Sequence, residues 1–163
     1  MHIRVIIGSQ SICFLPAIKT KYRRVRMVSK DIREFTTNQS IVVLATVSTE
    51  GAPNVAPMAW KVWYDDTTLL ILDNYMNATR ANVQNTGKAS VSAWNAESDT
   101  AYQLKGTAEY ANRGPYMEKG IDHMSSKKPG ASPRGVVVLH VQAVYSQKPG
   151  DQAGELITAT RST

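Results

Sequence analysis

The chain alternates short β-rich segments with only a few short helical ones, and this arrangement restricts its fold more than any other feature. Strands are expected where β-branched and aromatic residues cluster, at residues 41–47, 53–64, 67–73, 88–94, 101–110 and 135–145. Short helices are expected from Ser29 or Asp31, over residues 77–86, and from Pro115 to about residue 126. A parallel sheet needs a crossover helix between successive strands, and this chain has too few. The sequence therefore predicts a mainly β protein with short helices, folded as a six-stranded antiparallel barrel.

Three of these strands carry more specific signals. Residues 41–47 are apolar almost throughout, which predicts a buried strand. Pro53 and Pro57 cannot donate a backbone hydrogen bond, so the first half of residues 53–64 is expected at a sheet edge or a bulge. Residues 101–110 alternate in polarity, as a strand with one buried face does. Because side chains fill so small a barrel, a ligand is expected outside it, beside an edge strand or between two subunits.

The formal net charge of +6 comes from one end of the chain. Residues 1–28 hold six of the 19 basic side chains and no acidic one, which leaves 13 of each sign in residues 29–163. We therefore divide the chain into a basic, poorly ordered extension (1–28) and one folded domain (29–163). Nucleic-acid-binding domains carry their positive charge on the folded face, so no nucleic-acid partner is expected. The compact pattern starts directly after Met27, which is a candidate initiator.

Several function classes are excluded by what the sequence lacks. No apolar run approaches the ~20 residues of a membrane-spanning helix, and the basic cluster of the first 28 residues follows the apolar part, unlike a secretory signal. We therefore expect a cytoplasmic protein with no membrane partner. The single cysteine, Cys13, and the scattered histidines at positions 2, 123 and 140 predict no metal site. No glycine-rich phosphate loop is present, and no side chain has the pattern of a catalytic residue.

The most informative segment is residues 72–83, where a strand ends, a short polar loop follows and a helix begins. Free backbone N–H groups at a helix N-terminus attract a dianion. The Thr79 hydroxyl, the Arg80 guanidinium and the Asn82 amide are suitable partners for a phosphate. The alternative interpretation is ordinary helix capping, with Asn77 as the N-cap and Arg80 in solvent.

The order of motifs along the chain resembles that of a known family. It runs Ala45-Thr46-Val47-Ser48-x-x-Gly51-x-Pro53-Asn54-Val55-x-Pro57-Met58, then a strand, then Thr79-Arg80-x-Asn82-Val83. This order, over about residues 30–147, resembles the pyridoxamine 5′-phosphate oxidase-like FMN-binding split barrels, and most of all their small flavin-binding members. The resemblance implies a homodimer that binds FMN at the subunit interface and transfers electrons or hydride to a small-molecule donor or acceptor.

The resemblance also implies the residues that bind the cofactor. The isoalloxazine ring would lie against the backbone of Val55, Ala56, Pro57 and Met58. The ring or the ribityl chain would contact Leu72, Asp73 and Asn74, and the phosphate would be held by Thr79, Arg80 and Asn82. Where the family often has a lysine before the threonine this chain has Ala78, so Arg80 is expected to supply the positive charge.

Other functions remain open from the sequence. The deazaflavin F420 is an alternative cofactor, although its acidic tail calls for more basic residues than the balanced domain holds. A non-catalytic flavin carrier is a further alternative, because no substrate-binding side chain stands out. The basic patch that pyridoxamine phosphate oxidases use to bind substrate is missing, so that activity is not expected. Trp60, Trp63 and Tyr75 are candidates either for stacking on a flavin or for ordinary packing.

Overall fold

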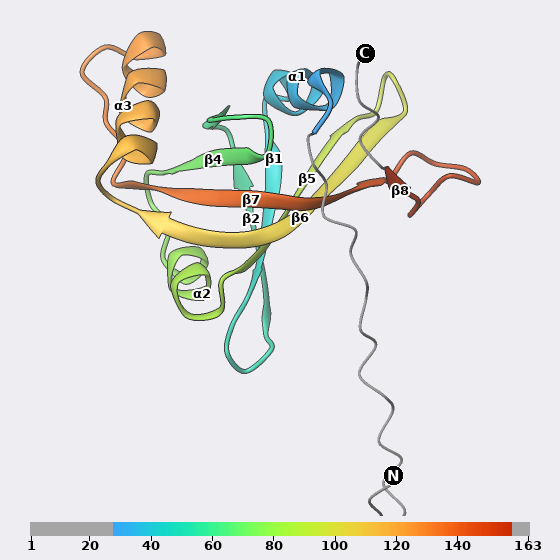
Figure 1. The fold of residues 1–163 in the computed structure, drawn as a ribbon, viewed down its shortest axis with the longest axis horizontal. Coiled ribbons are helices and arrows are strands. Elements are labelled where there is room, and N and C mark those ends of the chain that lie inside the picture. The colour runs from blue at the N-terminus through green and yellow to red at the C-terminus, as the bar shows by residue number, and fades with distance from the viewer. Residues whose placement is uncertain (1–27, 158–163) are drawn as a thin grey trace, which may run out of the picture.

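The structure is a computed structural model that describes residues 28–157, so nearly all of the predicted basic extension lies outside the described residues. One antiparallel sheet of eight strands curls into a half-barrel, and short helices surround it (Figure 1). The helices are α1 (Lys30–Asn38), α2 (Ala78–Thr86) and α3 (Pro115–Lys127). The strands are β1 (Val42–Val47), β2 (Pro53–Met58), β3 (Lys61–Trp63), β4 (Thr68–Asp73), β5 (Lys88–Asn95), β6 (Thr100–Ala111), β7 (Gly135–Ser146) and β8 (Leu156–Ile157).

The sheet has eight strands where the sequence predicted six. The strand order is β2-β1-β5-β6-β7-β4-β3, and β8 pairs with β7 near the end of the described chain. Residues 53–64, predicted as one strand, are two: β2 pairs with β1, whereas β3 pairs with β4 at the other edge of the sheet. Ala59 and Trp60 carry the chain from one edge to the other, and the Trp60 carbonyl accepts a hydrogen bond from the Leu72 N–H (3.0 Å). The edge position predicted from Pro53 and Pro57 is confirmed, since β2 ends the strand order.

The main core lies inside the curl of the sheet. It contains Leu44 from β1, Leu69 and Ile71 from β4, and Leu104 from β6, all fully buried. The sequence predicted a buried strand at residues 41–47, but β1 alternates between buried and half-buried positions. β4, in contrast, is buried along its whole length. The difference arises because α3 covers the outer face of β4 and β7 with a second apolar cluster, whereas Ala45 and Val47 of β1 line a hollow that is open to solvent.

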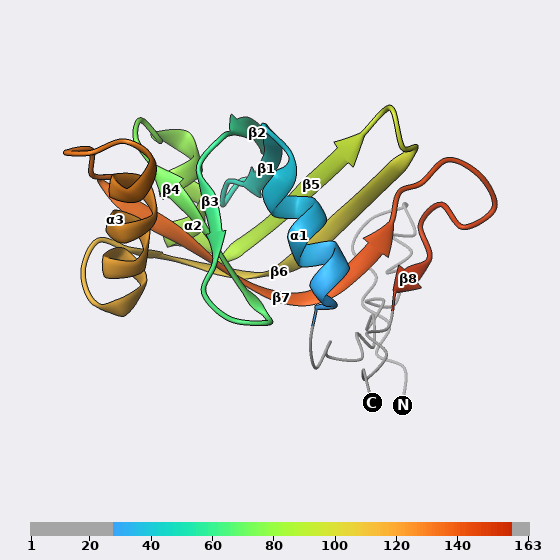
Figure 2. The same ribbon diagram turned by 90° about the horizontal axis from the view of Figure 1, so that it is seen from above.

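The helices begin and end where the sequence signals place them. Gly87 adopts the left-handed conformation (φ 62°) and ends α2, because a residue with a Cβ is strained there. Pro115 lies in the first turn of α3, where its missing N–H costs nothing. Figure 2 shows α1 lying across the ribbon, with α3 and β8 at opposite ends of the molecule. β6 shows the predicted alternation in part, with Leu104 and Ala108 buried and Thr107 and Glu109 exposed. Its pairing with β7 shifts register between Lys105 and Gly106, where Gln142 of β7 is the extra residue.

Candidate functional site

A groove of about 460 Å³ runs between the edge strand β2 and the loop that joins β4 to α2. This volume lies within the range of roughly 300–1,000 Å³ typical of ligand pockets. One wall is the end of β2 and the link to β3, and the other is the end of β4 and the start of α2. The lining residues are Asn54, Ala56, Pro57, Met58, Ala59, Trp60, Leu72, Asn74, Tyr75, Met76, Asn77, Ala78 and Thr79.

Six of the ten residues predicted to bind a cofactor line this groove: Ala56, Pro57, Met58, Leu72, Asn74 and Thr79. The other four do not. Val55 is 63% exposed and does not line the groove, although its neighbours Asn54 and Ala56 do. Asp73 is fully buried, Asn82 is buried behind the groove wall, and Arg80 points toward β6. Whether these ten residues contact a cofactor stays a prediction.

A network of four polar side chains supports the groove wall from behind. The Asn54 side-chain amide donates to the hydroxyls of Thr46 (3.1 Å) and Thr79 (3.0 Å). The Asn82 amide donates to the same Thr46 hydroxyl (3.1 Å). Thr46, Thr79 and Asn82 are all buried, so these bonds are shielded from water. The network joins β1, β2 and α2 and fixes the position of Thr79 at the groove.

The N-terminus of α2 opens onto the groove. Asn77 is the N-cap residue but its side chain makes no capping hydrogen bond, so the capping alternative considered from the sequence lacks its bond. The first helical bond of α2 runs from the Ala81 N–H to the Asn77 carbonyl (3.0 Å). The amides of the first helical turn have no partner within the helix. Asn77, Ala78 and Thr79 line the groove, and this end of the groove is therefore suited to an anion.

Asp73 and Arg80 meet at Tyr110 of β6. The Asp73 carboxylate accepts hydrogen bonds from the Met76 N–H (2.6 Å) and the Tyr110 hydroxyl (2.7 Å). Burial, and then the Asp73 carboxylate, raise the pKa of Tyr110. The Arg80 guanidinium carbon lies 6.0 Å from the centroid of the Tyr110 ring. Asp73 therefore shapes the turn after β4, and Arg80 is half-buried beside that turn.

The groove also contains aromatic residues that the site prediction left out. Trp60 and Tyr75, considered as stacking candidates, both line it. Trp63 does not, since it packs against the core and its indole N–H donates to the Arg33 carbonyl (3.1 Å). Trp60 and Tyr75 lie next to predicted contact segments in the sequence, and this adjacency was the signal that could have added them.

A cluster of positive charge lies behind Trp60. His123 of α3 contacts the Trp60 ring edge-on, with 6.3 Å between ring centroids. Burial, followed by the nearby charges of Lys127, Lys119 and Lys61, lowers the pKa of His123. Burial also lowers the pKa of Lys61, whose ammonium donates to the carbonyls of Gln39 and Ala59.

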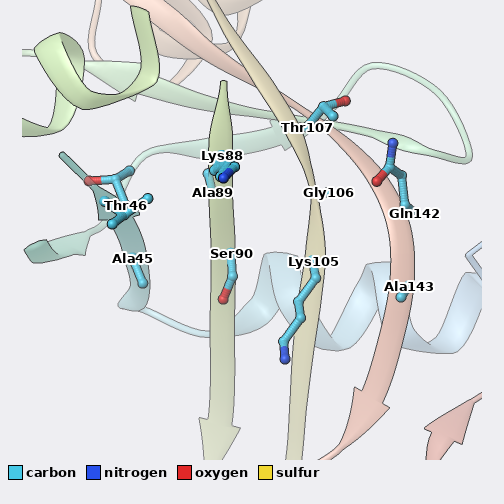
Figure 3. Close-up of a pocket in the computed structure, with 11 residues that line it drawn as sticks. Ala45, Thr46, Lys88, Ala89, Ser90, Lys105, Gly106, Thr107, Gln142 and Ala143 are labelled. Carbon is cyan, nitrogen blue, oxygen red and sulfur yellow. The ribbon is translucent and has the colours of Figure 1, made fainter. Parts of the chain in front are cut away.

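A second hollow, of about 570 Å³, lies on the outer face of the sheet across β1, β5, β6 and β7 (Figure 3). Small residues such as Ala45, Ser90, Gly106 and Ala143 form much of it. Within residues 28–157, the charged residues that line it are Lys88 and Lys105. No sequence motif indicates this hollow, because it arises from strands that are distant in the chain.

Two classes of feature are missing from residues 28–157. No group of three or more histidine, cysteine, aspartate or glutamate side chains is placed to hold a metal ion. No helix in this part of the chain is long and apolar enough to cross a membrane.

The curled antiparallel sheet, with a ligand-sized groove beside one edge strand, defines a split-barrel protein. The chain belongs to the pyridoxamine 5′-phosphate oxidase family, whose model matches residues 28–148. It is 40% identical over 119 residues to the uncharacterized protein MJ0282 of Methanocaldococcus jannaschii. The aligned region covers 72% of this chain and 79% of that protein.

Solved structures agree with this assignment. Group A Streptococcus HupZ superposes with a TM-score of 0.69 at 28% identity, over 78% of this chain and all of that one. An FMN-binding protein of Syntrophomonas wolfei gives a TM-score of 0.61 at 16% identity, over 71% and 86%. HutZ, the heme storage protein of Vibrio cholerae, gives 0.55 at 15% identity, over 74% and 94%. The two last similarities show the fold alone.

Proposed function

We propose that this protein binds FMN in the groove between β2 and the β4–α2 loop and acts as a flavin-dependent electron-transfer protein or oxidoreductase. The observation that carries the proposal is that one groove joins an edge-strand backbone to a helix N-terminus without a side-chain cap. A flavin mononucleotide has a flat ring at one end and a dianion at the other, and the two ends of this groove match those needs.

The phosphate end of the site is built from α2. The Thr79 hydroxyl accepts a hydrogen bond from Asn54, and a hydroxyl that accepts one bond still has its own proton to donate. A phosphate oxygen at the start of α2 would accept a hydrogen bond from this hydroxyl and others from backbone N–H groups of the first turn. Arg80, two residues after Ala78, would add positive charge to this end of the site.

The ring end of the site is built from β2 and its continuation. Pro57, Met58 and Trp60 offer apolar surface, and Leu72 closes the opposite wall. When bound, FMN supplies hydride or single-electron transfer at its N5 atom, and the protein contributes orientation and hydrogen bonds that tune the ring. These side chains would hold the ring and exclude water from one of its faces.

A flavin carrier is the second candidate, and a specific observation favours it. Among the groove-lining residues within the described chain there is no carboxylate, histidine, cysteine or lysine; Tyr75 is the one titratable side chain. General acid–base catalysis needs such a group within reach of the substrate. Reduction of the purified holoprotein by NADH or NADPH, followed by a screen of electron acceptors, distinguishes the two candidates: a carrier gives no turnover.

We also propose that two copies assemble around the cofactor. The groove is open to solvent, and Tyr75, which lines it, is 85% exposed. The outer-face hollow adds a surface of small side chains, and none of the helices of residues 28–157 lines it. A second subunit would cover both, which supports a two-fold homodimer. Light scattering tests this, and a stable monomer that retains FMN would refute it.

The visible absorption spectrum of the purified protein is the test of the cofactor. FMN gives two bands above the aromatic region, the alternative cofactor F420 gives essentially one, and haem gives a sharp Soret band. The groove lining has no histidine or cysteine, two of the residues that ligate haem iron, which favours flavin for this site. A colourless protein that takes up neither FMN nor riboflavin on titration would refute the proposal.

A further inference from the structure

Arg134 stands at the mouth of the groove, over Tyr75. The guanidinium carbon lies 5.5 Å from the centroid of the Tyr75 ring, within the range of a cation–π contact. Tyr75 lines the groove and is nevertheless 85% exposed. The pair therefore lies at the boundary between the groove and solvent, where an entering molecule would meet it.

The backbone fixes the position from which Arg134 extends. Its N–H donates to the Asp73 carbonyl (2.8 Å), which ties the α3–β7 connection to the end of β4. Its neighbours Pro133 and Gly135 are both buried. A Cβ on Gly135 would overlap the Tyr110 hydroxyl, so the chain passes in close contact with β6 at this point. Arg134 is thus an exposed side chain on a rigid base.

No carboxylate neutralises this guanidinium within residues 28–157. The ion pairs of that part of the chain involve Arg33, Lys30 and His140, and Arg134 is in none of them. Asp73 is the acidic residue whose backbone Arg134 contacts, but its carboxylate already accepts bonds from Met76 and Tyr110. An arginine held in place without a counterion is a ready partner for a carboxylate or phosphate, which it can bind through two parallel N–H groups.

We infer that Arg134, supported by Tyr75, binds the anionic group, a phosphate or a carboxylate, of an organic molecule that enters the groove. The inference rests on the proposed function in that the groove holds FMN. Arg80 of α2 is the first positive charge proposed for this site. The inference adds Arg134, which is far from α2 in the sequence, as the second. The anion is either the phosphate of the cofactor or an acidic group on the molecule that exchanges electrons with it.

The test compares Arg134→Gln, Tyr75→Leu and Tyr75→Phe with a matched control, Lys148→Gln, which removes an equal charge near β8. FMN and riboflavin are titrated into each apoprotein and followed by flavin fluorescence. Inorganic phosphate and acetate are then titrated into the FMN-loaded proteins and followed by the flavin absorption spectrum. Because Arg134 and Tyr75 are exposed, these variants are expected to fold.

Two results support the inference and identify the source of the anion. If FMN affinity falls about ten- to a hundredfold in Arg134→Gln while riboflavin affinity is unchanged, the anion is the cofactor phosphate. If both flavins bind normally but the affinity for phosphate or acetate falls by about that factor, the anion belongs to a second molecule. In either case Tyr75→Phe should retain the affinity, and Tyr75→Leu should lose part of it, because the ring and not the hydroxyl supports the guanidinium.

Wild-type affinities in Arg134→Gln for all four probes, or an equal loss in Lys148→Gln, would overturn the inference. If the wild-type protein binds neither flavin, the proposed function fails separately. The Arg134 assignment is then decided by titrating phosphate and acetate into the flavin-free protein and following the arginine side-chain N–H signals by NMR. A shift of the Arg134 signal that saturates supports it, and no shift overturns it.

Discussion

Thr46 is the central acceptor of the polar network behind the groove, and its replacement by valine is the sharpest test of that network. Valine has nearly the shape of threonine, so the substitution removes the hydroxyl and little packing. Two amide N–H bonds of 3.1 Å lose their acceptor. Asn54 keeps its second bond to Thr79, whereas the bond to Thr46 is the one hydrogen bond of the buried Asn82 amide within the described chain.

The cost follows from that difference. A buried donor left without an acceptor costs roughly 1–3 kcal/mol. We therefore expect Thr46→Val to lower the free energy of unfolding by about 2 kcal/mol, which for a domain of this size lowers the melting temperature by roughly 6 °C. Because Thr46 positions Asn54 and Asn54 positions Thr79, FMN affinity should fall more than riboflavin affinity.

The assay is urea denaturation of wild type, Thr46→Val, Asn82→Ala and the double variant. A shared hydrogen bond predicts a coupling free energy of about 1 kcal/mol between the two sites. Thr37→Val, an exposed threonine on α1, is the control and should change stability by less than about 0.5 kcal/mol. Unchanged stability of Thr46→Val, or purely additive effects in the double variant, would refute the reasoning.

Three further predictions concern other parts of the molecule. Gly106→Ala should destabilise the fold by about 2 kcal/mol or more, since a Cβ at this position, opposite the β7 bulge, would overlap the backbone carbonyl of His140; a wild-type melting temperature would contradict this. The pKa of His123 is lowered, so the imidazole binds a proton less well in the folded protein than in the unfolded chain. The free energy of unfolding should therefore decline as the pH falls below about 6.5. His123→Gln should flatten this part of a profile of melting temperature against pH. Arg80→Ala should weaken FMN binding about ten- to a hundredfold in fluorescence titrations and leave riboflavin binding nearly unchanged. Equal losses for both ligands would remove Arg80 from the phosphate site.

Local patterns were enough to predict most of the secondary structure. The stop at Gly87 and the start at Pro115 depend on neighbours in the chain, and the structure confirms both, whereas the alternation in residues 101–110 is present only in part. The division of residues 53–64 into β2 and β3 was missed. No glycine or proline marks residues 59 and 60, and the break exists because each half pairs with a different strand of the sheet.

The site was harder to predict than the fold, for a related reason. The segments that form the groove were identified, since strand ends and helix starts are readable from sequence. The direction of each side chain depends on partners distant in the chain. Asp73 is turned inward by Tyr110 of β6, and Asn82 by Thr46 of β1. Arg134 reaches the groove only because β7 pairs with β4.

The two-residue link at Ala59 and Trp60 has a mechanical consequence. It joins β2 and β3, the two edge strands of the sheet. Along the strand order β2 pairs only with β1, and β3 pairs only with β4. Met58 and Trp60 line the groove on this side. The link therefore connects the two edges covalently where no strand pairing joins them, and hydrogen bonds from the Leu72 N–H and the Lys61 ammonium to its carbonyls hold it beside the groove.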